Sequence, residues 1–183
     1  MKVFDMIVAE RRHMAALLAT LTPAQLRTPS LCAAWTVHDI GAHLISYLRL
    51  GQLKIYYAIA RTGADFDRFN IDLTRRYARR PAAEIAAYLD EYASSRVTIP
   101  RSGYDPVLAD IVLHDLDVRR PLGIARPPHE DRLRVVFGHL AGVPSPGFAM
   151  RGRLAGLRLE ATDTGWVRGT GAPDRGPAES IAP

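Results

Sequence analysis

A chain of 183 residues can enclose one complete hydrophobic core, and its 48% hydrophobic and 23% charged residues are typical of a globular protein. It has no run of about 18 apolar residues for a membrane span, no secretory signal, because Asp5 and Glu10 interrupt its N-terminal region, and no disulfide framework, because Cys32 is its single cysteine. These features favour a cytoplasmic protein without a membrane partner.

The charge does not indicate a nucleic-acid-binding protein. The formal net charge is +5, carried mostly by arginines that occur in scattered pairs, such as Arg75-Arg76 and Arg79-Arg80. A binding surface for nucleic acid would be expected to concentrate this charge in one stripe or tract. We therefore expect no nucleic-acid partner, and keep binding through the arginines only as a minor alternative.

The first third of the chain predicts helices. Apolar residues recur at spacings of three and four over residues 3–20, with Arg11 interrupting the stripe. Residues 21–26 predict a turn followed by a short helical piece. Thr36 followed by Asp39 forms a capping box, which predicts a helix that starts at Thr36 and continues to about residue 61.

The middle of the chain predicts further helices separated by loops. Residues 62–67 are expected to form a loop and residues 68–79 a helix; another helix starts at Pro81 and ends before Pro100. Asp105 and Pro106 fit the N-cap and first helical position of the next helix, which stops near Pro121. Residues 132–140 predict a last short helix.

The pattern changes after residue 142. Residues 156–169 alternate apolar and polar side chains around a turn at Asp163-Thr164-Gly165, which predicts a β-hairpin. The segment after Gly169 is rich in glycine, proline and alanine and is expected to be loose. The sequence thus predicts a mainly α fold, with a helical bundle over residues 1–142 and a small α/β-like appendage, carrying the hairpin, over residues 143–183.

A metal site is predicted from two of these helices. Asp110 and His114 are four residues apart, so a helix places both on one face. His43, one turn after Asp39 on an otherwise apolar helix side, would complete a set of two histidines and one carboxylate if the helices are neighbours. Such a set binds zinc or another divalent ion with an open position. The alternative is that these residues form only structural ion pairs. Asp39 or Asp117 could accept a hydrogen bond from an imidazole N–H group and so fix the tautomer of the histidine.

Four other residues have two interpretations each. Arg119 and Arg120 could clamp a carboxylate of a substrate or of a cofactor, although surface charges at a helix end are the simpler interpretation. Trp35 is expected to anchor the core, with lining of a site as the alternative. Cys32 is expected to be an inert small hydrophobic residue, with a thiol-exchanging role as the alternative.

Two segments carry a resemblance to a known family. The segment SLCAAWTVHDIGAHL (residues 30–44) and the pattern D-x-x-x-H-D-x-D-x-R-R-P-L-G (residues 110–123) resemble the two metal motifs of the mycothiol-dependent maleylpyruvate isomerase family, within the DinB-like superfamily. Asn70, the stretch RRPAAEI (residues 79–85) and the tail over residues 156–180 resemble the same family. The resemblance spans nearly the whole chain.

The resemblance implies a DinB-like four-helix bundle, a divalent metal, commonly zinc, and mycothiol as thiol cofactor. It implies His43, Asp110 and His114 as the metal ligands. Asp110 departs from the family, in which a glutamate stands, so its carboxylate is shorter by one methylene group. Family members continue into a helix beyond the point where this chain stops at Pro183, so the C-terminal part is expected to be truncated.

Two functional hypotheses follow. The first is a metal-binding, mycothiol-dependent transferase or isomerase whose partners are a small thiol and a small electrophilic substrate. The second is a non-catalytic helical module that binds a metal or another ligand. The sequence names neither the substrate nor the oligomeric state, for which a homodimer is one option.

Overall fold

The computed structural model describes residues 2–33, 35–48, 57, 66–98, 103–142 and 156–181. These residues form two compact units, 1–125 and 126–183. The first unit is helical, and the second combines two helices with a small sheet. The prediction of a mainly α fold is therefore confirmed.

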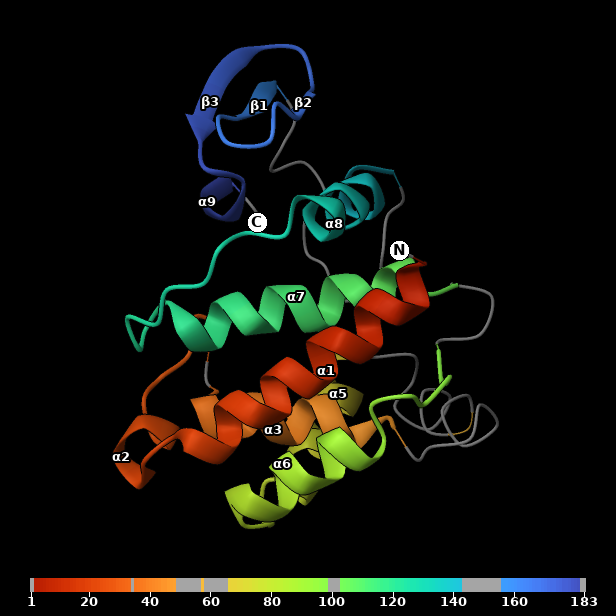
Figure 1. Cartoon of the computed structure of the whole chain (residues 1–183), viewed down its shortest axis with the longest axis vertical. Coiled ribbons are helices and arrows are strands. Elements are labelled where there is room, and N and C mark those ends of the chain that lie inside the picture. Colours follow the sequence, from red (N-terminus) through yellow and green to blue (C-terminus); the bar gives the residue numbers. More distant parts are fainter. Residues whose placement is uncertain are drawn as a thin grey trace. The chain divides into compact units, whose positions relative to one another are not determined.

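In the described residues of the N-terminal unit, helices pack side by side as a bundle (Figure 1). The helices α1 and α3 each contact both α6 and α7, and α3 also contacts α5. This pattern of contacts places α1, α3, α6 and α7 around one core, with α5 beside α3. In chain order the helices are α1 (Val3–Thr20), α2 (Pro23–Leu26), α3 (Val37–Ser46), α5 (Phe66–Tyr77), α6 (Ala82–Glu91) and α7 (Asp105–Arg119).

Large apolar side chains from all four bundle helices fill the core. Each fully buried side chain of this size contributes about 1.5–3 kcal/mol through removal of apolar surface from water. The apolar stripe predicted over residues 3–20 contributes Ile7 and Met14 to this core. Members exposed by less than 2% are Ile7 and Met14 of α1, Val37, Ile40 and Ile45 of α3, Ile85 and Leu89 of α6, and Leu108 and Val118 of α7.

Local signals set the helix starts more accurately than the helix ends. The capping box predicted at Thr36 is present, with Asp39 accepting from the Thr36 main-chain N–H. Asp105 is the first residue of α7 rather than its N-cap, which is Tyr104. The helix predicted from Thr36 to about residue 61 is confirmed over Val37–Ser46, but it does not continue through residues 47 and 48, since α3 ends at Ser46. Residues 49–56 and 58–65 lie outside the described part. Phe66 and Asp67, predicted as loop, already belong to α5.

The C-terminal unit contains the predicted hairpin and one strand that the sequence did not indicate. Strand β1 (Leu157–Ala161) pairs antiparallel with β2 (Val167–Arg168) and parallel with β3 (Ala172–Gly176). The loose segment predicted after Gly169 is therefore wrong, because it forms β3 and the short helix α9 (Ala178–Ile181). Strand β3 does not alternate apolar and polar residues, and it contains Pro173. The proline is tolerated because β3 is an edge strand, in which only one side forms main-chain hydrogen bonds with a neighbouring strand.

Helix α8 (Glu130–Gly142) lies within the second compact unit, residues 126–183, whereas the sequence predicts a bundle that extends to residue 142. Leu133 and Val136 of this helix are buried. The ring of Phe137 stacks on Trp166 from the hairpin with 4.4 Å between centroids, which links α8 to the sheet of its own unit.

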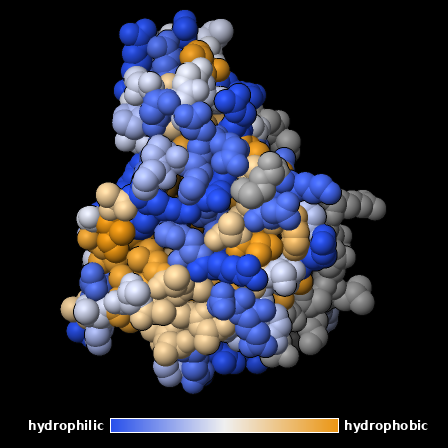
Figure 2. Space-filling model, viewed as in Figure 1, coloured by the Kyte–Doolittle hydropathy of each residue, from blue (hydrophilic) through white to orange (hydrophobic). Residues whose placement is uncertain are grey.

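Polar and hydrophobic side chains are both present on the face of the molecule drawn in Figure 2. Figure 2 shows hydrophobic side chains gathered in limited patches on an otherwise hydrophilic face. Across the described ranges the large hydrophobic residues that are exposed are Leu31, Tyr57, Ile71 and Val167. None of the helices in these ranges combines the length and the apolar character that crossing a membrane requires.

Candidate metal centre

Helix α3 brings His43 into the bundle interior. The capping box at Thr36 fixes the start of the helix, and His43 follows two turns later among buried apolar residues. The histidine is only 4% exposed. A buried imidazole requires partners for its ring nitrogens, so its surroundings decide what it can do.

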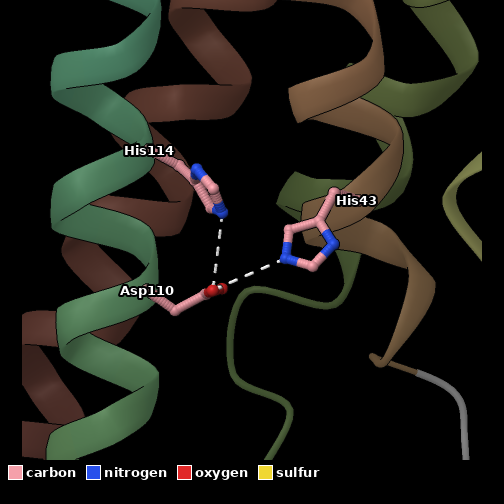
Figure 3. Close-up of side chains that lie close together, drawn as sticks. All are labelled: His43, Asp110 and His114. Atoms are coloured by element: carbon pink, nitrogen blue, oxygen red, sulfur yellow. Dashed lines mark hydrogen bonds and ion pairs between the residues drawn. The ribbon is translucent and has the colours of Figure 1, made fainter. Parts of the chain in front are cut away.

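Helix α7 supplies two more donors on the facing side (Figure 3). Asp110 and His114 lie one turn apart, with 3.6 Å between Oδ1 of Asp110 and Nε2 of His114. The same Oδ1 lies 3.5 Å from Nε2 of His43. One donor atom from each of the three residues lies within 4.8 Å of the others. The structure thus brings together the three residues that the sequence predicts as metal ligands.

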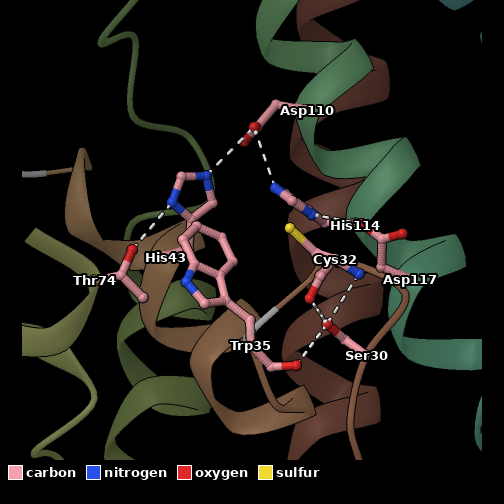
Figure 4. Close-up of polar contacts among 8 residues, drawn as sticks. All are labelled: Ser30, Cys32, Trp35, His43, Thr74, Asp110, His114 and Asp117. Carbon is pink, nitrogen blue, oxygen red and sulfur yellow. Dashed lines mark hydrogen bonds and ion pairs between the residues drawn. The ribbon is translucent and has the colours of Figure 1, made fainter. Parts of the chain in front are cut away.

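Each imidazole is held at its other nitrogen (Figure 4). Nδ1 of His114 lies 2.9 Å from Oδ2 of Asp117, as predicted. Nδ1 of His43 lies 3.3 Å from Oγ1 of Thr74, which belongs to α5. Asp39, the other predicted partner, is used in the capping box instead. No sequence pattern points to Thr74, because a single threonine in a polar helix has no distinguishing neighbours.

The electrostatics of the site favour a negative carboxylate beside positive partners. Burial alone would raise the pKa of Asp110, but the hydrogen bond from His43 and the charges of His43, His114 and Arg11 together lower it. Burial would lower the pKa of His114, whereas the hydrogen bond to Asp117 and the charges of Asp110 and Asp117 raise it. The Asp110 side chain is 39% exposed and those of His43 and His114 are 5% and 14% exposed, so solvent reaches the site at Asp110.

Aromatic rings border the two imidazoles. The centroid of the Trp35 ring lies 4.9 Å from that of His43 and 6.1 Å from that of His114. Tyr47 meets His43 edge-on at 5.9 Å. Trp35 therefore lines the site, which was the alternative interpretation of this residue. Burial and the nearby charge of Asp110 raise the pKa of Tyr47, so its hydroxyl stays protonated.

Cys32 lies near this group on the segment before α3. Burial, followed by the charges of Asp117 and Asp110, raises the pKa of its thiol. A raised pKa disfavours the nucleophilic thiolate. The predicted inert character of this cysteine agrees with its environment.

The two arginines predicted to bind a carboxylate have different surroundings. Arg119 is buried, and its Nε lies 2.6 Å from Oδ2 of Asp115, while a terminal nitrogen donates to the Ile124 carbonyl. Nine residues separate it from Asp110, which places it roughly half a turn around α7. Arg120 is exposed at the end of this helix. Their role in binding a cofactor stays a prediction.

A different arginine lies close to the site. Arg11 of α1 is buried, and one of its terminal nitrogens donates to the carbonyls of Ala93 and Ser95. Burial lowers the pKa of Arg11 to about 10, and the charge of Asp110 opposes this shift. The sequence signal for this residue is its position as the charged interruption in an apolar stripe.

The donor set fits a divalent metal ion. Two imidazole nitrogens and one carboxylate oxygen converge from two helices, and both imidazoles have Nδ1 partners that leave Nε2 directed at the third donor. Zinc and similar ions accept such nitrogen and oxygen ligands, and three protein ligands leave a position for a further molecule. His43, Asp110 and His114 could hold the ion.

A comparison with known protein families shows to which family the chain belongs. The profile of the mycothiol maleylpyruvate isomerase N-terminal domain matches residues 7–105, which is more than half of the chain. The chain belongs to this family. Membership implies the DinB-like helical fold that the bundle displays. The comparisons with curated proteins and with solved structures gave no match.

The mycothiol maleylpyruvate isomerase N-terminal domain match covers α3 and α5, with His43 and Thr74, and stops at the first residue of α7. Asp110 and His114 lie just beyond it. Their place in the site therefore rests on the geometry around His43.

Proposed function

We propose that this chain is a divalent-metal-binding enzyme that uses a small thiol, mycothiol, in a transferase or isomerase reaction on a small electrophile. The observation that carries the proposal is the convergence of His43 Nε2 and His114 Nε2 on one oxygen of Asp110. Membership in a family that is described by mycothiol and by maleylpyruvate isomerase supports the thiol and the class of reaction.

The proposed roles of the residues follow from their positions. His43, Asp110 and His114 bind the ion, for which zinc is the best candidate, while Asp117 and Thr74 orient the imidazoles. A bound ion would lower the pKa of a coordinated thiol and so supply the thiolate at neutral pH. Trp35 covers one side of the imidazoles and limits the access of water there.

Metal analysis tests the binding part of this proposal. We expect about one zinc ion per chain in the purified protein, since the site has one set of three ligands. His43→Ala removes the buried ligand and should abolish stoichiometric binding. The matched control is His129→Ala, which changes an exposed histidine outside the site. Retention of the metal by His43→Ala would refute the site.

A thiol assay tests the catalytic part. The zinc-loaded protein is incubated with mycothiol and maleylpyruvate, and then with other small electrophiles, and thiol consumption and product isomers are followed. Turnover that disappears in His43→Ala but not in His129→Ala supports the enzyme. Stoichiometric metal without turnover on any of these compounds would favour the non-catalytic binding module instead.

A further inference from the structure

Helix α5 supplies no ligand to the candidate metal centre, yet it contacts α3 through two polar pairs beside it. Thr74 lies 3.3 Å from Nδ1 of His43, and the Tyr47 hydroxyl donates to Oδ1 of Asn70. His43 and Tyr47 are one turn apart, as are Asn70 and Thr74, so the pairs form two successive contacts between the helices. Helix α5 is thereby aligned with the helix that carries the buried ligand.

The direction of the His43–Thr74 hydrogen bond has two possible forms. If Nδ1 carries the proton, it donates to Oγ1 of Thr74, and Nε2 keeps a free lone pair that faces Asp110 at 3.5 Å. If Nε2 carries the proton, it donates to Asp110, and the Thr74 hydroxyl donates to Nδ1. Only the first form allows His43 to bind a cation through Nε2, because a protonated nitrogen has no lone pair to offer.

Thr74 is well suited to fix the first form. It is 1% exposed, so water cannot readily replace its hydroxyl. Throughout the described part of the chain, Nδ1 of His43 has this oxygen as its hydrogen-bonding partner. Loss of the hydroxyl would leave a buried N–H without an acceptor whenever His43 binds a metal.

We propose that Thr74 is a positioning residue for the metal centre, whose hydroxyl oxygen accepts a hydrogen bond from the Nδ1–H group of His43 and so keeps Nε2 available as a ligand. This inference rests on the proposed function, since it assumes that His43 binds a metal ion. Helix α5 would then influence the affinity for the metal through Thr74, although none of the three ligands lies on this helix. Asp117 has the corresponding position behind His114.

Two substitutions at Thr74 separate the hydroxyl from the shape of the side chain. Thr74→Val keeps the branched shape and removes the acceptor, and we expect zinc affinity to fall about 10–100-fold, as for other groups that orient metal-bound histidines. Thr74→Ser keeps the hydroxyl and should bind zinc within about threefold of the wild type. The matched control is Ser46→Ala on α3, which removes a buried hydroxyl that has no hydrogen-bond partner within the described ranges. This control should leave the affinity unchanged.

The experiment is a zinc titration of the full metal-free chain against a chromophoric chelator. A wild-type chain that binds no zinc would refute the proposed function itself. Wild-type binding together with equal or tighter binding by Thr74→Val would overturn only the role of Thr74, because the hydroxyl would then be idle or donating. If Thr74→Val does not fold, the proton on Nδ1 of His43 is sought by nitrogen-15 NMR of the zinc-loaded wild type. A signal that exchanges slowly with water supports the role, and rapid exchange contradicts it.

Discussion

Among single residues, the three donors of the candidate centre differ in how they are held. His114 lies 2.9 Å from the carboxylate of Asp117, whereas His43 lies 3.3 Å from the neutral hydroxyl of Thr74. Asp110 is the most exposed of the three, and in the described part of the chain its side-chain ion-pair contacts are those with His43 and His114. Although burial opposes the shift, the hydrogen bond to Asp117 and the charges of Asp110 and Asp117 raise the pKa of His114.

This difference predicts a pH-dependent contribution of Asp117 to the stability of the metal-free protein. The pKa of folded His114 is raised above 6.5, so its pairing with Asp117 stabilises fully below about pH 6.5 and is lost as the pH rises through the raised value. Asp117→Asn should lower the free energy of unfolding by about 1–2 kcal/mol near pH 5.5 and by less near pH 9. The lowered pKa of Asp110 keeps that residue ionised at both values.

Urea unfolding in the presence of a chelator measures both free energies. Asp72→Asn changes an exposed aspartate on α5 and should have little effect at either pH. An equal loss for Asp117→Asn at both pH values would mean that Asp117 stabilises the fold without the charge of His114.

The residues of the site could be predicted where helical spacing or a motif marked them. The spacing of Asp110 and His114 predicts one helix face, and the segment around Trp35 and His43 resembles a family motif. Thr74 could not be found this way, because its role depends on how α5 packs on α3. Contacts between distant helices leave no periodic trace in the sequence.

At the scale of helices, Gly41 allows α3 to approach its neighbours closely. A Cβ atom at this position would lie 3.0 Å from Cδ1 of Leu18 on α1 and 3.2 Å from Cγ2 of Ile85 on α6. Both distances are shorter than ordinary van der Waals contact, so a larger side chain must push the helices apart. His43 follows two residues later, and its position depends on this approach.

Gly41→Leu should therefore lower the free energy of unfolding by about 1–3 kcal/mol or more through overpacking, and should also weaken zinc binding through displacement of His43. Thermal unfolding and the chelator titration measure the two effects. Gly138→Ala is the matched control, because a Cβ on this glycine of α8 meets no atom within 4 Å. That change should stabilise the helix by about 0.5–1 kcal/mol. A Gly41→Leu variant as stable as the wild type would show that the helices separate without cost.

Helices and strands differ in how far local sequence signals predict them. The bounds of α1 and the start of α3 follow from periodicity and from a capping box, which are local signals. Strand β3 depends on main-chain pairing with β1, and its segment APDRG carries no strand signal of its own. The stack of Phe137 of α8 on Trp166 of the hairpin is a contact between distant residues, which no local pattern encodes.

For the whole chain, a metal ion at this centre would join segments that are far apart in the sequence. His43 and Asp110 are separated by 67 positions, and they lie on helices that meet in the bundle core. A ligand that binds the folded chain alone stabilises it in proportion to the logarithm of its concentration over the dissociation constant. The ion would thus stabilise the pairing of α3 with α7 in addition to any role in chemistry.

Zinc at about 100 times its dissociation constant should therefore raise the free energy of unfolding by about 2.7 kcal/mol. The chain has two tryptophans, so the variant Trp166→Phe leaves Trp35, beside both imidazoles, as the single fluorescent reporter. Its unfolding midpoint in urea should rise with zinc and return after addition of a chelator. The gain should vanish in the double variant that also carries His43→Ala. An equal gain in that variant would place the stabilising zinc elsewhere on the chain, since the buried ligand would then make no difference.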